Sequence, residues 1–204
     1  MYRTVAAALL LAGSIMVSAL SAAAGAEDVA SPARESHKAD VVYVPTPNDV
    51  VLRMLDLAKV GKDDVIYDLG CGDGRIVVLA AKKYGCRGVG YDIDPNRIKE
   101  CHASAKTYGV EDLVRFEQKN IFELDLRPAS VITLYLLPRL NVKLIPQLEK
   151  LKPGSRIVSH DFDMRGVKED KTVLMMSKED NVKHRIYLWT TPLKKEGAGR
   201  TKVE

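Results

Sequence analysis

The sequence predicts an α/β fold built on a doubly wound, mostly parallel seven-stranded sheet with a C-terminal antiparallel hairpin. Short apolar runs alternate with amphipathic segments along the chain of 204 residues, which is the pattern of parallel strands joined by right-handed helical crossovers. A glycine-rich stretch, Gly70-Cys71-Gly72-Asp73-Gly74, follows the first apolar run and precedes an apolar helix. Such a turn is typical of the ligand-binding edge of a Rossmann-like sheet.

The first predicted element of the domain is a helix over 47–59. Thr46 is a candidate N-cap, and Pro47 suits the first helical turn because its missing N–H is not needed there. Asp49 is placed to complete a capping box with Thr46. The pattern therefore indicates a well-started helix just before the first strand.

The later elements alternate between strand and helix. Gly85 and Gly109 are expected C-caps, Asp94 an expected N-cap, and Pro146 is expected to kink the helix that contains it. The predicted order is strand 65–68, helix 75–84, strand 86–91, helix 95–108, strand 113–117, strand 131–136, helix 138–151, strand 156–159 and hairpin strands 171–176 and 182–190.

The spacing of the three glycines in the loop limits the chemical class of ligand that the loop can bind. A dinucleotide-binding turn reads G-x-G-x-x-G, whereas this loop reads G-x-G-x-G with Asp73 inside it. A carboxylate there opposes a pyrophosphate and suits a ligand that carries cationic or hydroxyl groups. Asp92 closes the next strand, 20 residues after Gly72, where an acid can bind ribose hydroxyls. S-adenosylmethionine has this chemistry, and an NAD-linked dehydrogenase is the least favoured alternative.

The motif D-x-G-x-G-x-G from Asp68 to Gly74 resembles the first motif of class I S-adenosylmethionine-dependent methyltransferases, and Gly-Tyr-Asp92-Ile-Asp-Pro resembles their second. The resemblance implies that Asp92 takes the ribose hydroxyls and that Ile93 packs on adenine. It also implies that Gly70 and Gly72 line the methionine part, with Asp68 supporting its amino group.

A closer resemblance covers 43–162. Tyr43-Val-Pro-Thr-Pro before a V-V-x-x-M-L helix and the D-L-G-C-G-D-G-R-I-V run is similar to lysine methyltransferases that modify the adenine nucleotide translocase and the ATP synthase c-subunit, and to their bacterial relatives. It implies that the P-T-P segment lies over the cofactor pocket, with Thr46 on the cofactor side. Beyond Asn120 the chain is more similar to the bacterial relatives. The resemblance therefore supports the fold and the cofactor more strongly than it supports lysine as the substrate.

Strand ends supply the remaining candidates, because ligands bind outside the carboxyl ends of such strands. Asn120 is a candidate for the adenine edge and Ile121 for its face, the alternative for Ile121 being core packing. Tyr135 is the acceptor-side candidate, or else a tyrosine that caps the sheet; His160 is a candidate base, or else a structural histidine. The predicted cofactor-binding residues are Thr46, Asp68, Gly70, Cys71, Gly72, Asp73, Gly74, Asp92, Ile93, Asn120 and Ile121.

The amino-acid composition limits the classes of partner that this protein is expected to bind. A hydrophobic content of 46% supports one domain, and a net charge of +4 without a basic block gives no indication of nucleic acid. His37, His102 and His184 and the three cysteines have no metal-type spacing, so no metal is expected. The expected partner is a protein substrate, with membrane proteins among the candidates. The sequence makes no prediction of oligomeric state.

The N-terminal region predicts export. Residues 1–26 combine Arg3, an uncharged Ala/Leu-rich stretch and an A-x-A site at Ala24-Gly25-Ala26, as in a signal peptide. An uncleaved membrane anchor is the alternative, since residues 5–24 are just long enough to span. A linker over 27–42, a methyltransferase domain over 43–193 and a flexible tail over 194–204 follow. The N-terminus of the native protein, sequenced after cell fractionation, tests this prediction.

Two other functions remain open at this point. Export separates an enzyme from the cytoplasmic supply of S-adenosylmethionine, so the fold could serve as a non-catalytic module that binds a nucleoside or a protein. A methyltransferase for a small molecule is the third possibility. The leading hypothesis is methyl transfer to a protein side chain, namely lysine.

Overall fold

The structure is a computed structural model that describes residues 43–197. A seven-stranded sheet forms its centre, in the order β3-β2-β1-β4-β5-β8-β7. The first five of these strands are parallel to one another, and β8 runs antiparallel to both β5 and β7. The strands are β1 (Val65–Leu69), β2 (Arg87–Asp92), β3 (Val114–Gln118), β4 (Val131–Leu134), β5 (Arg156–His160), β7 (Lys171–Met176) and β8 (Lys183–Thr190). The predicted sheet and its terminal hairpin are confirmed.

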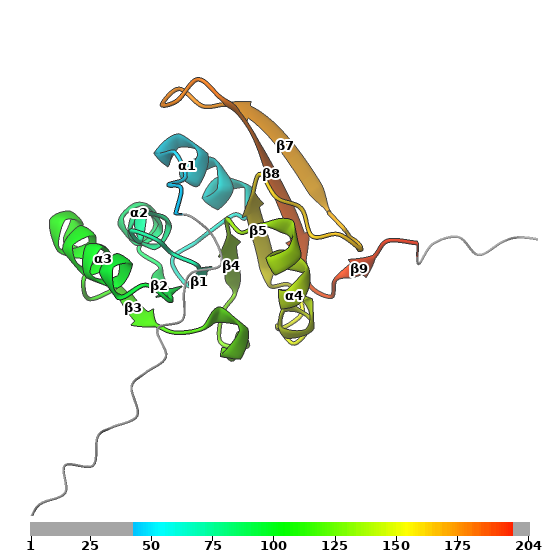
Figure 1. Ribbon diagram of the computed structural model, residues 1–204, viewed down its shortest axis with the longest axis horizontal. Coiled ribbons are helices and arrows are strands. Elements are labelled where there is room, and N and C mark those ends of the chain that lie inside the picture. Colours follow the sequence, from blue (N-terminus) through cyan, green and yellow to red (C-terminus); the bar gives the residue numbers. More distant parts are fainter. Residues whose placement is uncertain (1–42, 198–204) are drawn as a thin grey trace, which may run out of the picture. The chain divides into compact units, whose positions relative to one another are not determined.

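Helices cover both faces of the sheet, as Figure 1 shows, with α1, α2 and α3 on one side and α4 on the other. Their bounds are α1 (Asn48–Leu57), α2 (Arg75–Tyr84), α3 (Pro95–Tyr108), α4 (Pro138–Leu148) and the short 3-10 helix η1 (Ile121–Glu123). No helix within the described range has the length and apolar character needed to cross a membrane.

Because helices cover both faces of the sheet, its central strands carry apolar side chains on both sides. Ile66 and Val131 pack with α1 and α2, while Leu69 and Ile132 pack with α4. Adjacent residues of one strand therefore bury themselves in opposite cores, as expected for a parallel sheet covered on both sides. This rigid layer holds the strand ends from which the site is built.

The start of α1 differs from the prediction. Thr46 makes no capping bond, and the backbone N–H groups of Asn48 and Asp49 donate instead to the Glu179 carboxylate at 2.9 and 3.3 Å. The Asp49 carboxylate accepts from the backbone N–H of Lys178 at 2.7 Å. The turn between β7 and β8 thus caps the helix, which a local capping rule could not anticipate.

Several helices and strands also end at residues other than those predicted. Helix α1 ends at Leu57 rather than 59, β4 ends at Leu134 rather than 136, and α4 continues through Pro146 but ends at Leu148 rather than 151. Lys194–Lys195, assigned by sequence to a flexible tail, form β9 and pair with β6 (Val167–Lys168). The predicted signal peptide, the linker and residues 198–204 of the tail lie outside the described residues.

Candidate functional site

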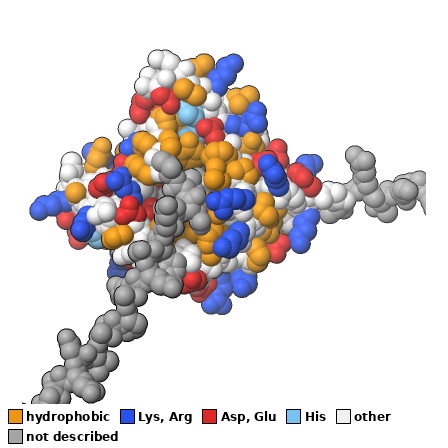
Figure 2. Space-filling view, in the orientation of Figure 1, with side chains coloured by type: hydrophobic (Ala, Val, Ile, Leu, Met, Phe, Trp, Pro, Cys, Tyr) orange, Lys and Arg blue, Asp and Glu red, His pale blue; other side chains and the backbone are white. Residues whose placement is uncertain are grey.

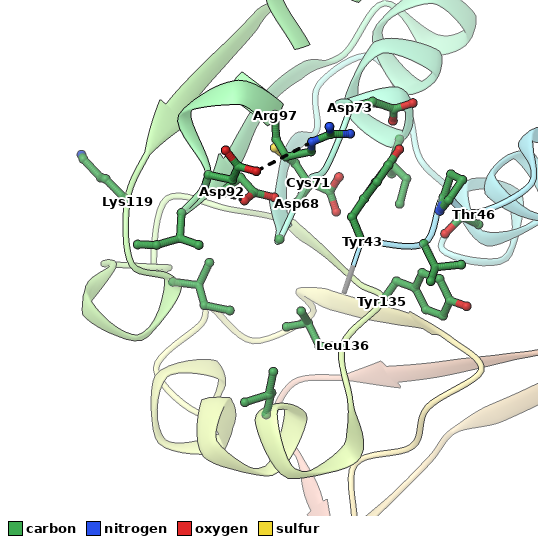
Figure 3. Close-up of a pocket in the computed structure, with 18 of the residues that line it drawn as sticks. Tyr43, Thr46, Asp68, Cys71, Asp73, Asp92, Arg97, Lys119, Tyr135 and Leu136 are labelled. Carbon is green, nitrogen blue, oxygen red and sulfur yellow. Dashed lines mark hydrogen bonds and ion pairs between the residues drawn. The ribbon is translucent and has the colours of Figure 1, made fainter. Parts of the chain in front are cut away.

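A cavity of about 460 Å³ opens at the carboxyl ends of β1, β2 and β4. Figure 3 shows Asp92 and Lys119 toward one side of it and Thr46 and Tyr135 toward the other. The structure brings ten predicted site residues to its wall. They are Thr46, Asp68, Gly70, Cys71, Asp73, Asp92, Ile93, Asn120, Ile121 and Tyr135.

The glycine loop makes the floor of this cavity possible. Gly70, Gly72 and Gly74 have φ values of +80°, +55° and +78°, a region that side chains disfavour. The backbone N–H groups of Gly70 and Cys71 donate to the Tyr91 carbonyl at 2.8 and 2.9 Å, which ties the loop to the end of β2. The loop is therefore a fixed turn.

Only the first of the three glycines lines the cavity. A Cβ on Gly72 would lie 2.2 Å from the Tyr43 ring, and a Cβ on Gly74 would lie 2.8 Å from the Phe116 ring. Gly72 and Gly74 therefore lie beside the cavity and not on its wall, and their part in cofactor binding stays a prediction. Gly72 leaves room for the segment that crosses the loop, and Gly74 lets the loop meet the core.

Asp68 is the most distinctive group at the site. Its side chain is 2% exposed, and Oδ1 accepts a hydrogen bond from the Thr133 hydroxyl at 2.7 Å. Oδ2 is buried and has no hydrogen-bond partner among residues 43–197. Burial raises the pKa of this carboxyl to about 7, opposed by the Thr133 hydrogen bond and reinforced by Asp92 and Asp73. A buried unpartnered oxygen is costly, so the site fits a ligand whose cationic group pairs with Asp68.

Asp92 holds the loop as well as facing the cavity. Its Oδ2 accepts from the backbone N–H of Gly72 at 2.9 Å, and its Oδ1 accepts from the backbone N–H of Asp94 at 2.9 Å. Each carboxylate oxygen can accept a further bond. The geometry therefore leaves Asp92 able to accept from two adjacent hydroxyls, as on a ribose.

We expect Asp92→Ala to weaken S-adenosylmethionine binding by about 1.5–3 kcal/mol, because hydrogen bonds to a charged acceptor are lost. Isothermal titration calorimetry measures this. Asp112→Ala is the matched control, because Asp112 is an exposed aspartate outside the cavity. Equal affinities in the two variants would remove Asp92 from the site.

A strap formed by Tyr43, Val44, Pro45 and Thr46 closes one side of the cavity. Arg75 donates to the Thr46 carbonyl at 2.9 Å and forms a 2.6 Å ion pair with Asp73. Burial raises the pKa of Asp73, but the hydrogen bonds and charge of Arg75 outweigh it and lower the pKa overall. The Asp73 charge is thus compensated by Arg75, and Asp73 serves to anchor the strap.

At the opposite side, Asn120 lines the cavity but its amide is engaged within the chain. Oδ1 accepts from the backbone N–H of Phe122 at 3.1 Å, and Nδ2 donates to Glu123 at 2.7 Å. Asn120 therefore shapes η1, and its hydrogen bond to an adenine edge stays a prediction. Ile93 and Ile121 supply apolar wall nearby.

Tyr135 and His160 do not occupy equivalent places. Tyr135 lines the cavity, and its ring centroid lies 4.0 Å from that of His160. His160 is fully buried, and its Nδ1 lies 3.0 Å from the Thr46 hydroxyl. Burial lowers its pKa to about 4, although Asp161 opposes this effect. His160 thus lies behind the cavity wall in contact with Thr46 and Tyr135, and its role as a base stays a prediction.

Sequence reasoning missed several residues of the wall. Leu136 and Leu140 add apolar surface beside Tyr135, and Arg97, Lys119 and Lys143 add positive charge. Leu136 was assigned to a strand, and the others lie on helices or loops that carry no motif. In the face seen in Figure 2, apolar side chains are bordered by lysine and arginine side chains.

Comparison with known proteins gives consistent matches. The family described as ANTKMT methyltransferase domain matches residues 68–171. A protein-lysine N-methyltransferase of Saccharolobus islandicus is 44% identical over 156 residues, which are 76% of this chain and 96% of that protein. A lysine N-methyltransferase of the ATP synthase c-subunit, from Caenorhabditis elegans, is 27% identical, covering 76% of this chain and 84% of that protein.

A solved structure also resembles this chain closely. It is described as an RNA methyltransferase from Salinibacter ruber in complex with S-adenosyl-L-homocysteine. The identity is 53% and the TM-score 0.67, with 73% of this chain and 94% of that chain covered. S-adenosylhomocysteine is what remains of S-adenosylmethionine once the methyl group has been transferred, so this neighbour agrees with the ligand chemistry inferred for the cavity.

Proposed function

This chain belongs to the family of ANTKMT methyltransferase domains, and from that premise we propose that it methylates a lysine side chain of a protein. It is an S-adenosylmethionine-dependent methyltransferase. The observation that carries the choice of acceptor is the 44% identity to a protein-lysine N-methyltransferase across 96% of that protein. The specific protein substrate is the finer part of the proposal.

Different residues of the cavity would bind different parts of the cofactor. Asp68 would pair with its ammonium group, Asp92 would accept from its ribose hydroxyls, and Ile93 and Ile121 would contact its base. When bound, S-adenosylmethionine supplies a methyl group on a positively charged sulfur, which is already a good leaving group. The chain therefore has mainly to align the acceptor, and alignment can contribute ~7–11 kcal/mol in favourable cases.

We place the acceptor beside Tyr135 and Leu136, on the side of the cavity where Thr46 also lies. A lysine must reach this side as a neutral amine, and desolvation against aromatic and apolar walls lowers the pKa of an ammonium group. Burial raises the pKa of Tyr135, with Asp161 adding to the effect, so its phenol stays protonated at neutral pH. We infer that Tyr135 orients the amine through its hydroxyl group and ring and does not act as a base.

A second candidate acceptor is RNA, for two reasons. The Salinibacter ruber structure, at 53% identity, is described as an RNA methyltransferase. In addition, Arg97, Lys119 and Lys143 border the cavity and suit a phosphate backbone. Protein remains the favoured acceptor because several relatives, among them those of Saccharolobus islandicus and Caenorhabditis elegans, are described as lysine methyltransferases of proteins.

Labelled methyl transfer separates the two candidates. The purified protein is incubated with labelled S-adenosylmethionine and a cell extract, and the product is digested with protease or with ribonuclease. We expect label that survives ribonuclease and appears as methyl-lysine after acid hydrolysis. Label released by ribonuclease would overturn the protein assignment in favour of RNA.

We expect Tyr135→Ala to reduce kcat by at least about tenfold while the affinity for S-adenosylmethionine changes by less than about twofold, because alignment is lost but cofactor contacts remain. Tyr108→Ala is the control, since Tyr108 is exposed on α3 and outside the cavity. A change confined to cofactor affinity would move Tyr135 from the acceptor side to the cofactor side.

A further inference from the structure

Behind the strap, three side chains that sequence spacing did not connect converge on one point. His160 ends β5, Asp161 follows it, and His184 lies on the neighbouring antiparallel strand β8. His160 Nε2 lies 2.8 Å from His184 Nδ1, His184 Nδ1 lies 3.0 Å from Asp161 Oδ2, and Asp161 Oδ2 lies 3.3 Å from His160 Nε2. The three atoms form a closed triangle.

The opposite atom of each residue is held by a separate partner. His160 Nδ1 is bonded to the Thr46 hydroxyl at 3.0 Å, and His184 Nε2 to Asp180 Oδ2 at 3.0 Å. Asp161 Oδ1 accepts from the backbone N–H of Arg185 at 2.7 Å. Each partner turns one nitrogen or oxygen of the triangle inward, as hydrogen-bonded neighbours of metal ligands do.

The backbone at Asp161 supports a specific role for the triangle. Its φ is +57°, in the left-handed region that few residues other than glycine adopt. Strained positions of this kind are found at sites where the surrounding structure requires one side-chain direction. Here the unusual turn after β5 directs the Asp161 carboxylate back toward the two imidazoles.

We propose that His160, Asp161 and His184 bind one divalent transition-metal ion, with zinc as the best match. Two imidazole nitrogens and one carboxylate oxygen form a common ligand set for zinc, which leaves a fourth position for water. Because the triangle edges are 2.8–3.3 Å, a point beside its plane can lie about 2.1 Å from all three atoms. The 29% exposure of the Asp161 side chain gives a path for entry from solvent.

Binding of the ion requires only that the inward-facing histidine nitrogens carry no proton. His160 keeps a proton on Nδ1 facing Thr46, and His184 keeps one on Nε2 facing Asp180, so the inward nitrogens coordinate as neutral imidazoles. Any proton on His184 Nδ1 leaves to solvent when the ion binds. The bound ion would join β5 to β8 and, through His160, support Thr46 and Tyr135 at the cavity wall.

The test uses the full chain without a histidine tag, stripped of metal by a chelator and dialysed. Titration with Zn²⁺ against a chromophoric chelator should give one ion per chain, and Co²⁺ should give the visible absorption of a low-symmetry, four- or five-coordinate site. Asp161→Asn and His184→Ala should each weaken Zn²⁺ binding by at least about 100-fold, and Asp180→Asn by about tenfold. Asn tolerates the left-handed backbone, so Asp161→Asn should fold.

His102→Ala is the matched control, because His102 is an exposed histidine on α3 outside the triangle. It should bind Zn²⁺ as the unaltered chain does, and circular dichroism should confirm that each variant is folded. If His184→Ala proves unfolded, the Zn²⁺ affinity of Asp161→Asn alone tests the proposal. Absence of saturable binding, or equal affinity in folded Asp161→Asn and His102→Ala, would overturn the proposal and leave a hydrogen-bonded cluster.

Discussion

Asp68→Asn is expected to weaken S-adenosylmethionine binding by at least about 100-fold at pH 7.5, the largest loss among cofactor-site variants. The carboxylate has one buried oxygen to which no described residue donates, and an ammonium group placed there would gain a charge-assisted hydrogen bond inside the protein. Asparagine keeps the size of the side chain and an acceptor for Thr133, but it has no charge to offer. Isothermal titration calorimetry measures the affinity.

The same carboxyl should make cofactor binding depend on pH. Its pKa is raised by burial to about 7, so below pH 7 it is neutral in the free protein and must lose its proton to form the ion pair. We expect about a tenfold loss of affinity for each unit below pH 7, and a second decline above about pH 8 as the cofactor's α-amino group deprotonates. A flat profile for the unaltered protein between pH 6 and 7.5 would contradict the pairing.

The pH dependence of the free energy of unfolding tests the raised pKa of Asp68 without any ligand. The pKa of this carboxyl in the folded state lies above its ordinary value of 3.8, so the folded protein holds more protons between about pH 4 and 7. The free energy of unfolding contributed by Asp68 therefore falls as pH rises through that range. Ligand-free Asp68→Asn should lack this fall and be at least as stable at pH 8. Asp112→Asn, at an exposed position outside the cavity, should alter neither property.

Gly74→Ala is expected to lower the free energy of unfolding by about 2–4 kcal/mol. Its Cβ would lie 2.8 Å from the Phe116 ring and 2.9 Å from Cys101 Sγ, and both neighbours are buried. The φ of +78° adds the strain of a side chain in the left-handed region. Chemical denaturation followed by circular dichroism measures the change.

Gly109→Ala separates the two causes. Gly109 has a φ of +65° at the end of α3, and a Cβ there would meet nothing within 4 Å. This variant carries the backbone strain alone and should cost about 1–2 kcal/mol. If Gly74→Ala costs no more than Gly109→Ala, the contact with Phe116 and Cys101 is not what requires glycine in the loop.

Much of the fold could be predicted because its signals are local. Apolar runs that end in Asp68 and Asp92 marked two neighbouring strands, and glycines at alternate positions marked the turn between strand and helix. The parallel arrangement then places both acids at one edge of the sheet, since successive strands of such folds point the same way. The cofactor cavity follows from this pattern with little further information.

Local signals gave an incomplete account where a distant segment supplies the contact. Thr46 and Asp49 matched a capping box, but the β7–β8 turn provides Glu179 as the cap and leaves the Thr46 hydroxyl for His160. Gly72 and Gly74 matched a ligand loop, but their missing side chains leave room for Tyr43 and Phe116. In each case the deciding contact joins residues far apart in the chain.

The sequence by itself determined the order of strands and helices, the glycine turn and the acids at its edge, because hydrophobic periodicity and backbone preference act over a few residues. Only the tertiary structure decided which groups meet. Pairing β5 with β8 brings His160 and His184 within 2.8 Å, although 24 residues separate them. Burial then left one Asp68 oxygen without a hydrogen-bond partner in the described part of the chain. Contacts and solvent exclusion of this kind depend on the packing of the whole domain, which no local pattern encodes.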